Sequence, residues 1–407
     1  MESARNTIHH RTDDRAPQPH RAPRSRLRRR LGLRDAAVDA ITALLAEAGI
    51  EVGGDRPWDM RMHHPQAAER ILARGSLGLG ESYMEGWWDC DRVDQFIARV
   101  LMARLDEKVG TAALMVHGLR ARLFNLQNLR RTWQVGEVHY DLGNDFFEAM
   151  LDSSMAYTCG YWARADNLAD AQRAKLDLVC RKLGLEPGMR LLDIGCGWGS
   201  LMRYAAEHYG VECVGLTISR EQAEFGQARC SGLPVSFRLQ DYRQFNRGGS
   251  ERFDRIASVG MFEHVGAKNH VAFFEMARRS LNEEGLFLLH TIGNSVTSPK
   301  TDAWIDKYIF PNGKLPSAKE IASVLEQRFL IEDWHNFGPD YDRTLMAWWD
   351  NFDQAWPGLQ EKYGERFYRM WKYYLMSCAG FFRSRQGQLW QLVLSKTERA
   401  RVYRSVR

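Results

Sequence analysis

The chain has 407 residues, of which 44% are hydrophobic, 26% charged and 11% aromatic, and its net charge is +5. This length suggests two or three domains, and the composition excludes wholesale disorder and a collagen-like fibre because it supplies enough apolar residues for an ordinary core. Residues 1–30 carry the whole positive excess, which excludes a broad basic face for nucleic acid, since such a face needs charge spread over a folded surface.

Residues 1–30 are the first segment in chain order, and we predict a disordered basic arm there. Pro17, Pro19 and Pro23 oppose an amphipathic helix, and no apolar core of a secretory signal follows the basic start. Further along, no apolar run reaches the roughly 18–20 residues of a membrane-spanning helix. The chain has seven cysteines, and none of them have the C-x-x-C spacing of a zinc knuckle. Because no export signal is found either, we predict reduced thiols and a cytoplasmic protein.

Residues 31–102 are predicted to form a small α-rich domain. Ala36, Val38, Ile41 and Leu44 recur at helical spacing, and a further amphipathic pattern begins near Val93.

Residues 103–134 are predicted to be a basic amphipathic linker. Leu119, Leu123 and Leu126 share one helical face, and arginines lie around it. Such a helix can lie on an anionic membrane surface. Periodicity alone favours the plainer alternative, a linker helix packed on its own protein with solvated arginines.

Residues 135–407 show strands alternating with helices, which is typical of a parallel α/β sheet. Strands are predicted at Arg190–Ile194, Val211–Leu216, Val235–Arg238, Phe253–Val259, Gly285–His290, Phe329–Trp334 and Leu389–Leu394. Helices are predicted near Ser200–His208, Arg220–Arg229 and Asn269–Leu281, with an aromatic-rich helical stretch over 342–384. We find no internal repeats.

A glycine loop follows the first of these strands, in the sequence RLLDIGCGWGS (190–200). Its glycines lie where a strand opens into a helix, and small residues there let the backbone close on a ligand while the helix N-terminus favours negative charge. The spacing is G-x-G-x-G, and Asp193 precedes it in the strand. This pattern resembles the class I S-adenosylmethionine (SAM) methyltransferase loop, in which the strand-end acid lies near the methionine amino group. An ordinary tight turn is the alternative.

Further segments extend the resemblance to one family. In chain order they are VHYDLGNDFFEAMLD (138–152), AYTCGYW (156–162), VGLTISREQ (214–222), SVGMFEHVG (258–266) and LLHTIG (288–293). The chain therefore resembles the cyclopropane-fatty-acyl-phospholipid synthase family and the related mycolic-acid cyclopropane synthases. The resemblance implies a class I SAM-methyltransferase (Rossmann-like) sheet with helical insertions over 135–407, beside the smaller N-terminal α-rich domain.

The resemblance also implies the residues that bind SAM. They are Tyr157, Thr158, Gly195, Gly197, Gly199, Thr217, Gln222, Asp241 and Tyr242. The strand before Ile218 lacks the terminal acid that usually binds the ribose. The Thr217 hydroxyl and the Gln222 amide would replace that acid, since both can bond a diol.

In this family the general base is a bound bicarbonate ion. The resemblance implies as its ligands Cys159, Glu263, His290, Tyr341 and the backbone of Ile292. Glu263 and the ion can share a proton, so the carboxylate would anchor the anion. A lone buried cysteine or histidine would normally indicate packing, and only the joint pattern favours function here. Cys378 matches a family position near the site without an expected catalytic role, and no metal site is expected, because His63 and His64 lack spaced partners.

Aromatic residues crowd the stretch that follows, and their faces attract cations. For any single one, the core or the lining of an acyl groove is the favoured interpretation. They are Tyr341, Trp348, Trp349, Phe352, Trp356, Tyr363, Phe367, Tyr368, Trp371, Tyr373 and Tyr374.

We therefore expect an enzyme that transfers a methylene group from SAM across the cis double bond of an unsaturated phospholipid acyl chain. One alternative is a SAM-dependent fatty-acyl C-methyltransferase that gives a methyl- or methylene-branched chain. Another is a non-catalytic lipid- or SAM-binding protein, which would be expected to lose Glu263, His290 or Tyr341. The expected partner is membrane phospholipid, reached by peripheral association with the inner face of the cell membrane through the N-terminal domain, and no nucleic acid is expected. Whether the protein is a homodimer stays open.

Overall fold

The computed structural model describes residues 24–108, 142–298 and 301–407, with the backbone alone described for residues 24–35. Most of the predicted linker, from residue 109 to residue 134, lies outside these ranges, as do residues 1–23 of the predicted arm. The first helix begins at Arg24, inside the range that the sequence predicts as an arm.

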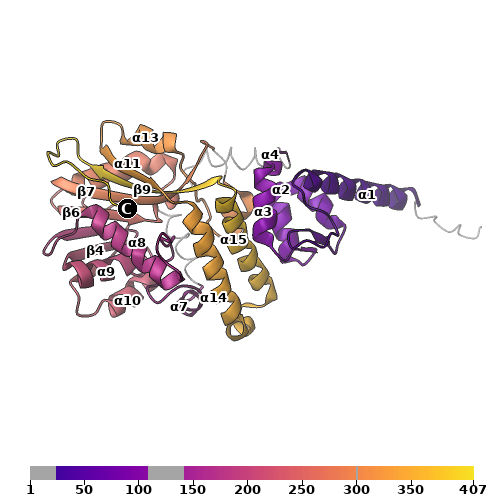
Figure 1. Ribbon diagram of the computed structural model, residues 1–407, viewed down its shortest axis with the longest axis horizontal. Helices are drawn as coiled ribbons and strands as arrows, with labels where there is room; N and C mark the ends of the chain where they lie inside the picture. Colours follow the sequence, from indigo (N-terminus) through magenta and orange to yellow (C-terminus); the bar gives the residue numbers. More distant parts are fainter. Residues whose placement is uncertain (1–23, 109–141, 299–300) are drawn as a thin grey trace, which may run out of the picture.

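The N-terminal unit is helical, as predicted, with one short pair of strands. Its elements are α1 (Arg24–Glu47), β1 (Arg61–Met62), α2 (Gln66–Met84), β2 (Trp88–Asp89), α3 (Val93–Met102) and α4 (Leu105–Lys108). Helix α3 buries Val93, Phe96 and Ile97, so its apolar stripe packs inward. Helix α1 extends away from the rest of the molecule (Figure 1).

A seven-stranded sheet forms the centre of the remaining chain, in the order β5-β4-β3-β6-β7-β9-β8. The strands are β3 (Arg190–Ile194), β4 (Glu212–Thr217), β5 (Val235–Leu239), β6 (Phe253–Val259), β7 (Leu281–Asn294), β8 (Leu330–Asn336) and β9 (Gly387–Ser395). Six of these lie where the sequence predicts a strand of similar length, and β7 is longer than predicted. The sheet is not wholly parallel, because β9 runs antiparallel between β7 and β8.

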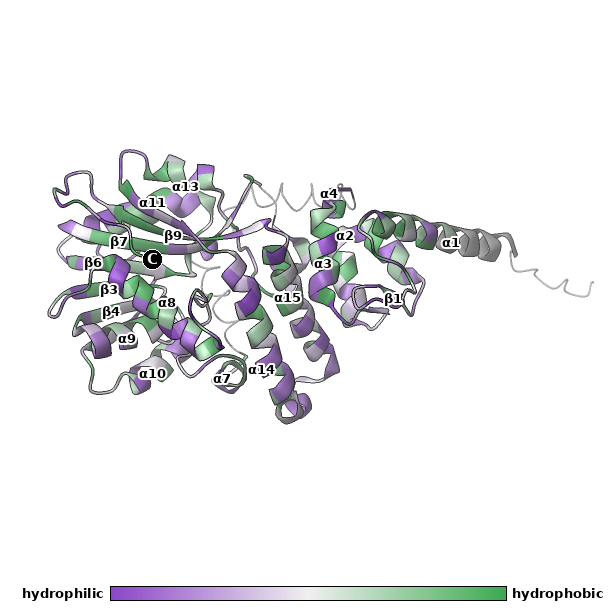
Figure 2. Ribbon diagram, viewed as in Figure 1, coloured by the Kyte–Doolittle hydropathy of each residue, from purple (hydrophilic) through white to green (hydrophobic). Residues whose placement is uncertain are grey.

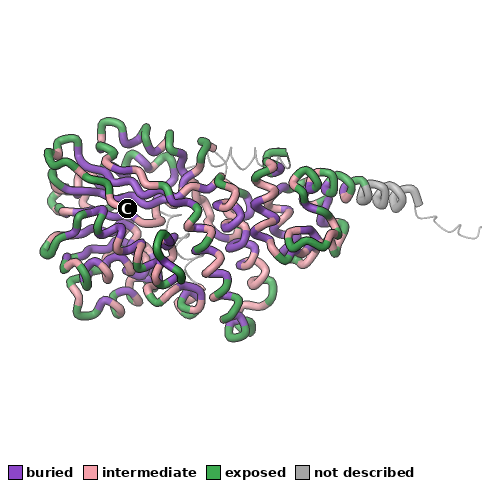
Figure 3. Tube along the Cα trace, in the orientation of Figure 1, coloured by how far each residue is buried: buried purple, intermediate pink, exposed green. Residues whose placement is uncertain are grey.

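Helices cover both faces of this sheet, which hides its apolar strands from water. They are α8 (Leu168–Leu183), α9 (Ser200–Tyr209), α10 (Arg220–Arg229), α11 (His270–Ser280) and α13 (Ala318–Leu325). Successive residues of β3 point to opposite faces, so Leu191 packs in the core with α8 and α9, while Leu192 packs in the core with α11 and α13. The inner strands are accordingly apolar and mostly buried, whereas the edge strands β5 and β8 are partly exposed (Figures 2 and 3).

Two further helices lie away from the sheet. Helix α7 (Asn144–Met150) packs against the long helix that begins at Pro339, and α12 (Ala303–Tyr308) packs against α2.

A pair of long helices, α14 (Pro339–Tyr363) and α15 (Glu365–Arg383), is inserted between β8 and β9. The aromatic-rich stretch predicted as one helical region is thus two helices, broken at Gly364 with a φ of +73°. The pair lies between the sheet and the N-terminal unit (Figure 1). It shares one hydrophobic core with that unit, in which Phe96 of α3 and Trp371 of α15 are both buried.

Ion pairs cross the same boundary. Asp94 of α3 is fully buried and accepts hydrogen bonds from Arg92 and from Arg383 of α15, and Arg383 also holds Asp342 at the start of α14. Glu81 of α2 accepts from Lys307 and Tyr308 of α12. The N-terminal unit is therefore joined firmly to the helices that carry predicted site residues.

Candidate active site

The glycine loop forms one wall of a small cavity of about 130 Å³ at the carboxyl ends of β3 and β4. The backbone at Gly195 has a φ of +83°, and a β-carbon there would lie 2.5 Å from the Met261 side chain, so a larger residue would collide. Gly197 lines the same cavity. Gly199 does not line it, because it lies next to Phe237 and precedes α9.

The opposite wall of the small cavity contains the predicted replacement for the missing acid. Thr217 Oγ1 donates to Gln222 Oε1 at 3.2 Å and accepts from the Ser219 amide at 3.1 Å, so the two side chains are fixed together. Asp241 is buried and pairs with Arg243 at 2.6 Å. The predicted SAM residues that the structure brings to this cavity are Gly195, Gly197, Thr217, Gln222, Asp241 and Tyr242.

Asp193 lies behind the glycine loop, buried at the end of β3. Burial raises the pKa of its carboxyl to about 7, and the nearby charge of Lys175 opposes that rise. Burial lowers the pKa of Lys175 to about 8. The Lys175 ammonium of α8 donates to Thr158 Oγ1 at 2.9 Å, so a buried charge supports a predicted SAM residue. The sequence analysis missed Lys175, and its only signal is a lysine on an otherwise buried helix face.

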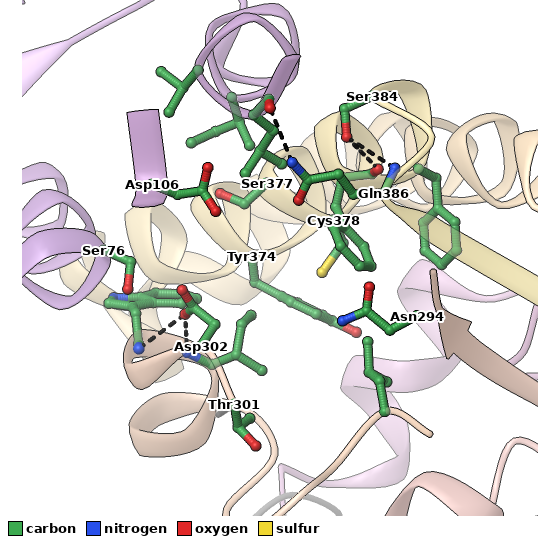
Figure 4. Close-up of a pocket in the computed structure, with 18 of the residues that line it drawn as sticks. Ser76, Asp106, Asn294, Thr301, Asp302, Tyr374, Ser377, Cys378, Ser384 and Gln386 are labelled. Atoms are coloured by element: carbon green, nitrogen blue, oxygen red, sulfur yellow. Dashed lines mark hydrogen bonds between the residues drawn. The ribbon is translucent and has the colours of Figure 1, made fainter. Parts of the chain in front are cut away.

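A second, larger cavity of about 1000 Å³ contains the remaining predicted SAM residues, Tyr157 and Thr158, together with Glu263, Ile292 and Tyr341. From there it extends between α15 and the N-terminal unit. Figure 4 shows residues of α2, α15 and β7 around this space. The apolar side chains that the N-terminal unit contributes include Ile41, Leu44, Leu45, Ile71, Phe96, Ile97 and Leu101.

Glu263 is the buried acid of the large cavity. Its Oε1 accepts from the Ile292 amide at 2.6 Å, whereas its Oε2 has no hydrogen-bond partner among the described residues. Burial raises the pKa of this carboxyl to about 7, although the hydrogen bond from Ile292 opposes the rise. The carboxyl is thus poised to take up or release a proton near neutral pH.

His290 and Cys159 are buried behind the wall of the large cavity and do not line it. His290 Nδ1 lies 3.2 Å from Gln391 Nε2, while His290 Nε2 has no partner within the described part of the chain. Burial lowers the pKa of His290 well below its usual value, so the ring is neutral. Burial raises the pKa of the Cys159 thiol well above its usual value, which excludes a thiolate nucleophile at neutral pH.

The two cavities share a wall at Gly260 and His264, which line both. Gly260 has a φ of +69°, and a β-carbon there would lie 2.5 Å from Thr158 Cγ2. Burial lowers the pKa of His264 to about 4, so its imidazole is neutral, and its Nδ1 has no partner among the described residues. Neither residue was predicted as a site residue, although both lie within the SVGMFEHVG segment.

Aromatic rings surround the end of the large cavity that holds Glu263. Tyr341 stacks on Phe382 with ring centroids 4.6 Å apart, and the hydroxyls of Tyr157 and Tyr374 lie 2.9 Å apart. Tyr341, Tyr373 and Tyr374 are the members of the predicted aromatic set that line the cavity. The others pack within α14, α15 and their neighbours, as the plainer interpretation predicts. Cys378 also lines the cavity, with the pKa of its thiol raised by burial to about 12.

Comparison with known proteins adds two kinds of finding, and the first concerns sequence. A family model described as mycolic acid cyclopropane synthetase matches residues 127–392. The chain is 55% identical over 356 residues to the cyclopropane-fatty-acyl-phospholipid synthase of Escherichia coli strain K12, which covers 87% of this chain and 92% of that protein. It is also 39% identical over 272 residues to cyclopropane mycolic acid synthase 1 of Mycobacterium tuberculosis, covering 61% of this chain and 91% of that protein.

The second finding concerns structure. The cyclopropane synthase MmaA2 of Mycobacterium tuberculosis matches with a TM-score of 0.61 and 35% identity, over 65% of this chain and 98% of that one. The mycolic acid cyclopropane synthase CmaA1, solved with SAH and CTAB, matches with the same TM-score, identity and coverage. Both matches identify the sheet and its helices as a class I SAM-methyltransferase fold.

Proposed function

The chain belongs to the mycolic acid cyclopropane synthetase family, and from this membership we propose that it adds a methylene group from SAM across the cis double bond of an unsaturated phospholipid acyl chain. It is a SAM-dependent methyltransferase. The observation that carries the proposal is the meeting of two unlike cavities at Gly260 and His264. The small cavity offers polar groups for SAM, and the large one offers apolar walls for an acyl chain.

The chemistry of an alkene explains why two adjoining cavities are needed. An isolated double bond is a weak nucleophile, so the rate depends mainly on how the enzyme positions it relative to the sulfonium methyl. In the reaction the carbon–sulfur bond of SAM breaks, and the π electrons form the new carbon–carbon bond. The resulting carbocation must lose a proton from the new methyl to close the ring, and a base must lie nearby. The faces of Tyr157 and Tyr341 at this end of the large cavity favour such a cation.

We propose a bicarbonate ion as that base, held beside Glu263. The buried Glu263 carboxyl suits an anion that shares a proton, because its Oε2 has no partner among the described residues. His290 Nε2 lacks a partner there too, but His290 does not line the cavity. With its pKa near 7, Glu263 can carry a proton and donate it, so that it attracts an anion instead of repelling it. When bound, the ion would supply the base for the proton that ring closure releases. The Ile292 amide, implied as a ligand of the ion, here donates to Glu263 and fixes the carboxyl.

The fate of the double bond tests the reaction. Cyclopropanation and methylation followed by loss of a different proton both add one CH₂ unit, so the two products have the same mass, but only the alternative C-methyltransferase keeps a double bond. We expect the purified protein with SAM and a cis-monounsaturated phospholipid to give a cyclopropane product that ozone does not cleave. A product of the same mass that ozone still cleaves would overturn cyclopropanation and favour the alternative.

A buffer experiment tests the base separately. Activity should fall in carefully decarbonated buffer and return when bicarbonate is added. Full activity after exhaustive removal of bicarbonate would rule out bicarbonate as the base, but it would not contradict the proposed methyl transfer.

We also propose that the acyl chain enters the large cavity directly from a bilayer leaflet. No helix in the described residues is long and apolar enough to span a membrane. Met102 at the end of α3 is 60% exposed and Val296 after β7 is 67% exposed, and both line the large cavity. Exposed apolar side chains at a cavity mouth would let a chain pass from lipid to protein without crossing water. Peripheral association on the cytoplasmic side is part of this proposal, and a homodimer stays a prediction.

Vesicles of uncharged phosphatidylcholine with cis-monounsaturated chains test this entrance without surface charge. Met102→Asp with Val296→Asp should lower activity on these vesicles and keep activity on the same lipid in detergent micelles. Val271→Asp is the matched control, since Val271 is 43% exposed and does not line the cavity. An equal loss on micelles, or an equal loss in the control, would contradict entry at this mouth.

A further inference from the structure

The loop over residues 156–162 carries three predicted site residues, Tyr157, Thr158 and Cys159, yet it has no helix or strand of its own. Its shape must therefore come from contacts with neighbouring elements. Two helices supply these contacts, α8 on one side and α14 on the other.

Helix α8 holds the loop mainly through hydrogen bonds to carbonyl and amide groups of the loop backbone. Gln172 Nε2 donates to the Thr158 carbonyl at 2.7 Å, and the Tyr161 amide donates to the Ala171 carbonyl at 2.9 Å. Gly160 lies so close to Ala171 that a β-carbon there would be 2.9 Å from the Ala171 methyl. This side ties the loop to the helix that also carries Lys175.

Helix α14 holds the other side of the loop through Asp340, whose Oδ2 accepts from the Trp162 amide at 2.7 Å, and through the hydroxyl of Thr344, which is fully buried. Thr344 Oγ1 donates to the Asp340 carbonyl at 2.8 Å and accepts from the Gly160 amide at 3.1 Å and from Trp162 Nε1 at 2.9 Å. One donor and two acceptor sites are all that a hydroxyl possesses, so its capacity is fully used. The Cys159 sulfur lies 3.7 Å away as a further weak contact.

The position of Thr344 in α14 connects the loop to another predicted site residue. Tyr341 lies three residues earlier in α14, and residues three apart lie on the same face of a helix. Tyr341 lines the large cavity with Glu263, whereas Thr344 holds the loop that supplies Tyr157 to the same cavity. We propose that Thr344 is a positioning residue that fixes the loop 156–162, and with it Tyr157 and Thr158, relative to Tyr341 and Glu263.

This inference rests on the proposed function, because it assumes methyl transfer to an acceptor in the large cavity. A displacement of about 1 Å between reacting groups can lower a rate about 100-fold even when binding survives. Losing the Thr344 hydroxyl should therefore lower kcat more than it weakens SAM binding, because six predicted SAM residues line the small cavity and only Tyr157 and Thr158 of the set lie on the loop.

The test compares Thr344→Val, which keeps the shape and removes the hydroxyl, with Thr344→Ser, which keeps the hydroxyl. Release of S-adenosylhomocysteine measures turnover whatever the lipid product, and titration calorimetry measures SAM affinity. For Thr344→Val we expect kcat to fall about 10- to 100-fold with a clearly smaller change in SAM affinity. Thr344→Ser should recover most of the rate. Hydrogen exchange of the peptide spanning 156–162 should rise in the valine variant alone, because the Gly160 amide loses its acceptor.

Ser280→Ala supplies the matched control, because Ser280 is equally buried and accepts from Asn246 Nδ2 far from both cavities. A full rate in Thr344→Val would overturn the proposal, as would an equal loss of rate in Ser280→Ala or a failure of Thr344→Ser to recover. If the wild-type protein releases no S-adenosylhomocysteine with unsaturated phospholipid, the proposed function fails. Hydrogen exchange and SAM affinity would still report the role of the Thr344 contacts in that case.

Discussion

The small cavity and the large cavity share a wall, yet they are built in different ways. The small one is formed almost entirely by residues 194–265, at the ends of strands that are neighbours in the sheet. The large one joins α1, α2 and α3 to β7, α12 and α15, whose residues lie hundreds of positions apart in the chain. Most predicted residues of the SAM site are thus close together in sequence, whereas the proposed acceptor cavity needs residues of the N-terminal unit as well.

The largest expected effect separates the chemical roles of the two cavities. Glu263→Gln should lower turnover about 10²- to 10⁴-fold and leave SAM affinity nearly intact, because Glu263 lines the large cavity and not the small one. Gln222→Ala should instead weaken SAM binding, because Gln222 lines the small cavity and bonds Thr217. Calorimetry with SAM and turnover assays check both, and equal losses of affinity in the two variants would contradict the division.

A second prediction concerns the shared wall. Gly260→Ala should lower turnover about 100-fold, because the new methyl would collide with Thr158 where the cavities meet. Gly86→Ala is the matched control, since Gly86 has the same φ of +69° and nothing within 4 Å of an added β-carbon. Both variants carry the same backbone strain, so a similar loss of turnover in each would mean that strain alone is responsible.

The third prediction tests whether the large cavity depends on docking of the N-terminal unit. Asp94→Asn should destabilise the protein by roughly 3 kcal/mol, because it leaves Arg383 and Arg92 without their buried partner. Lipid turnover should fall while SAM affinity persists. Asp170→Asn removes an exposed pair with Arg173 and should cost under about 1 kcal/mol. Chemical denaturation measures both, and equal losses of stability would contradict the role of the boundary.

The most gradual expected effect is a pH dependence of stability, which is spread over more than two pH units. Glu263 has a folded pKa of about 7, above its ordinary 4.5, so the folded state favours the protonated form. This contribution to stability is complete below about pH 4.5 and is lost as the pH rises to about 7. Relative to Glu263→Gln, ligand-free wild-type protein should therefore lose stability across that window, with a slope of at most about 1.4 kcal/mol per pH unit. A constant difference in Tm across these pH values would contradict the raised pKa.

The same contrast explains which parts of the molecule could be predicted from the sequence. Strands such as Arg190–Ile194 and Phe253–Val259 coincide with the prediction because a buried strand is an apolar run that is visible locally. Six predicted SAM residues meet in one cavity because the ends of neighbouring parallel strands converge.

Features that depend on tertiary contact were not visible in the sequence. The helical stretch before β9 was predicted, but the antiparallel direction of β9 was not, because an apolar run does not indicate which way a strand pairs. Lys175 and Thr344 are ordinary helix residues until the loop 156–162 packs against them. The N-terminal unit was predicted as a separate domain, yet its side chains share a core with α14 and α15 and line the large cavity.

The place of β9 has a consequence for the protein's synthesis. This strand lies between β7 and β8 but leaves the ribosome after both, and after the two helices that complete the acceptor cavity. A nascent chain that stops before Gly387 holds an intact glycine loop beside two strands with unpaired edges. Such a chain contains every residue that lines the two cavities, yet β8 and the helix pair that follows it are not joined to β7 until β9 has been made. A chain that terminates before Gly387 should therefore expose strand edges that favour aggregation or proteolysis.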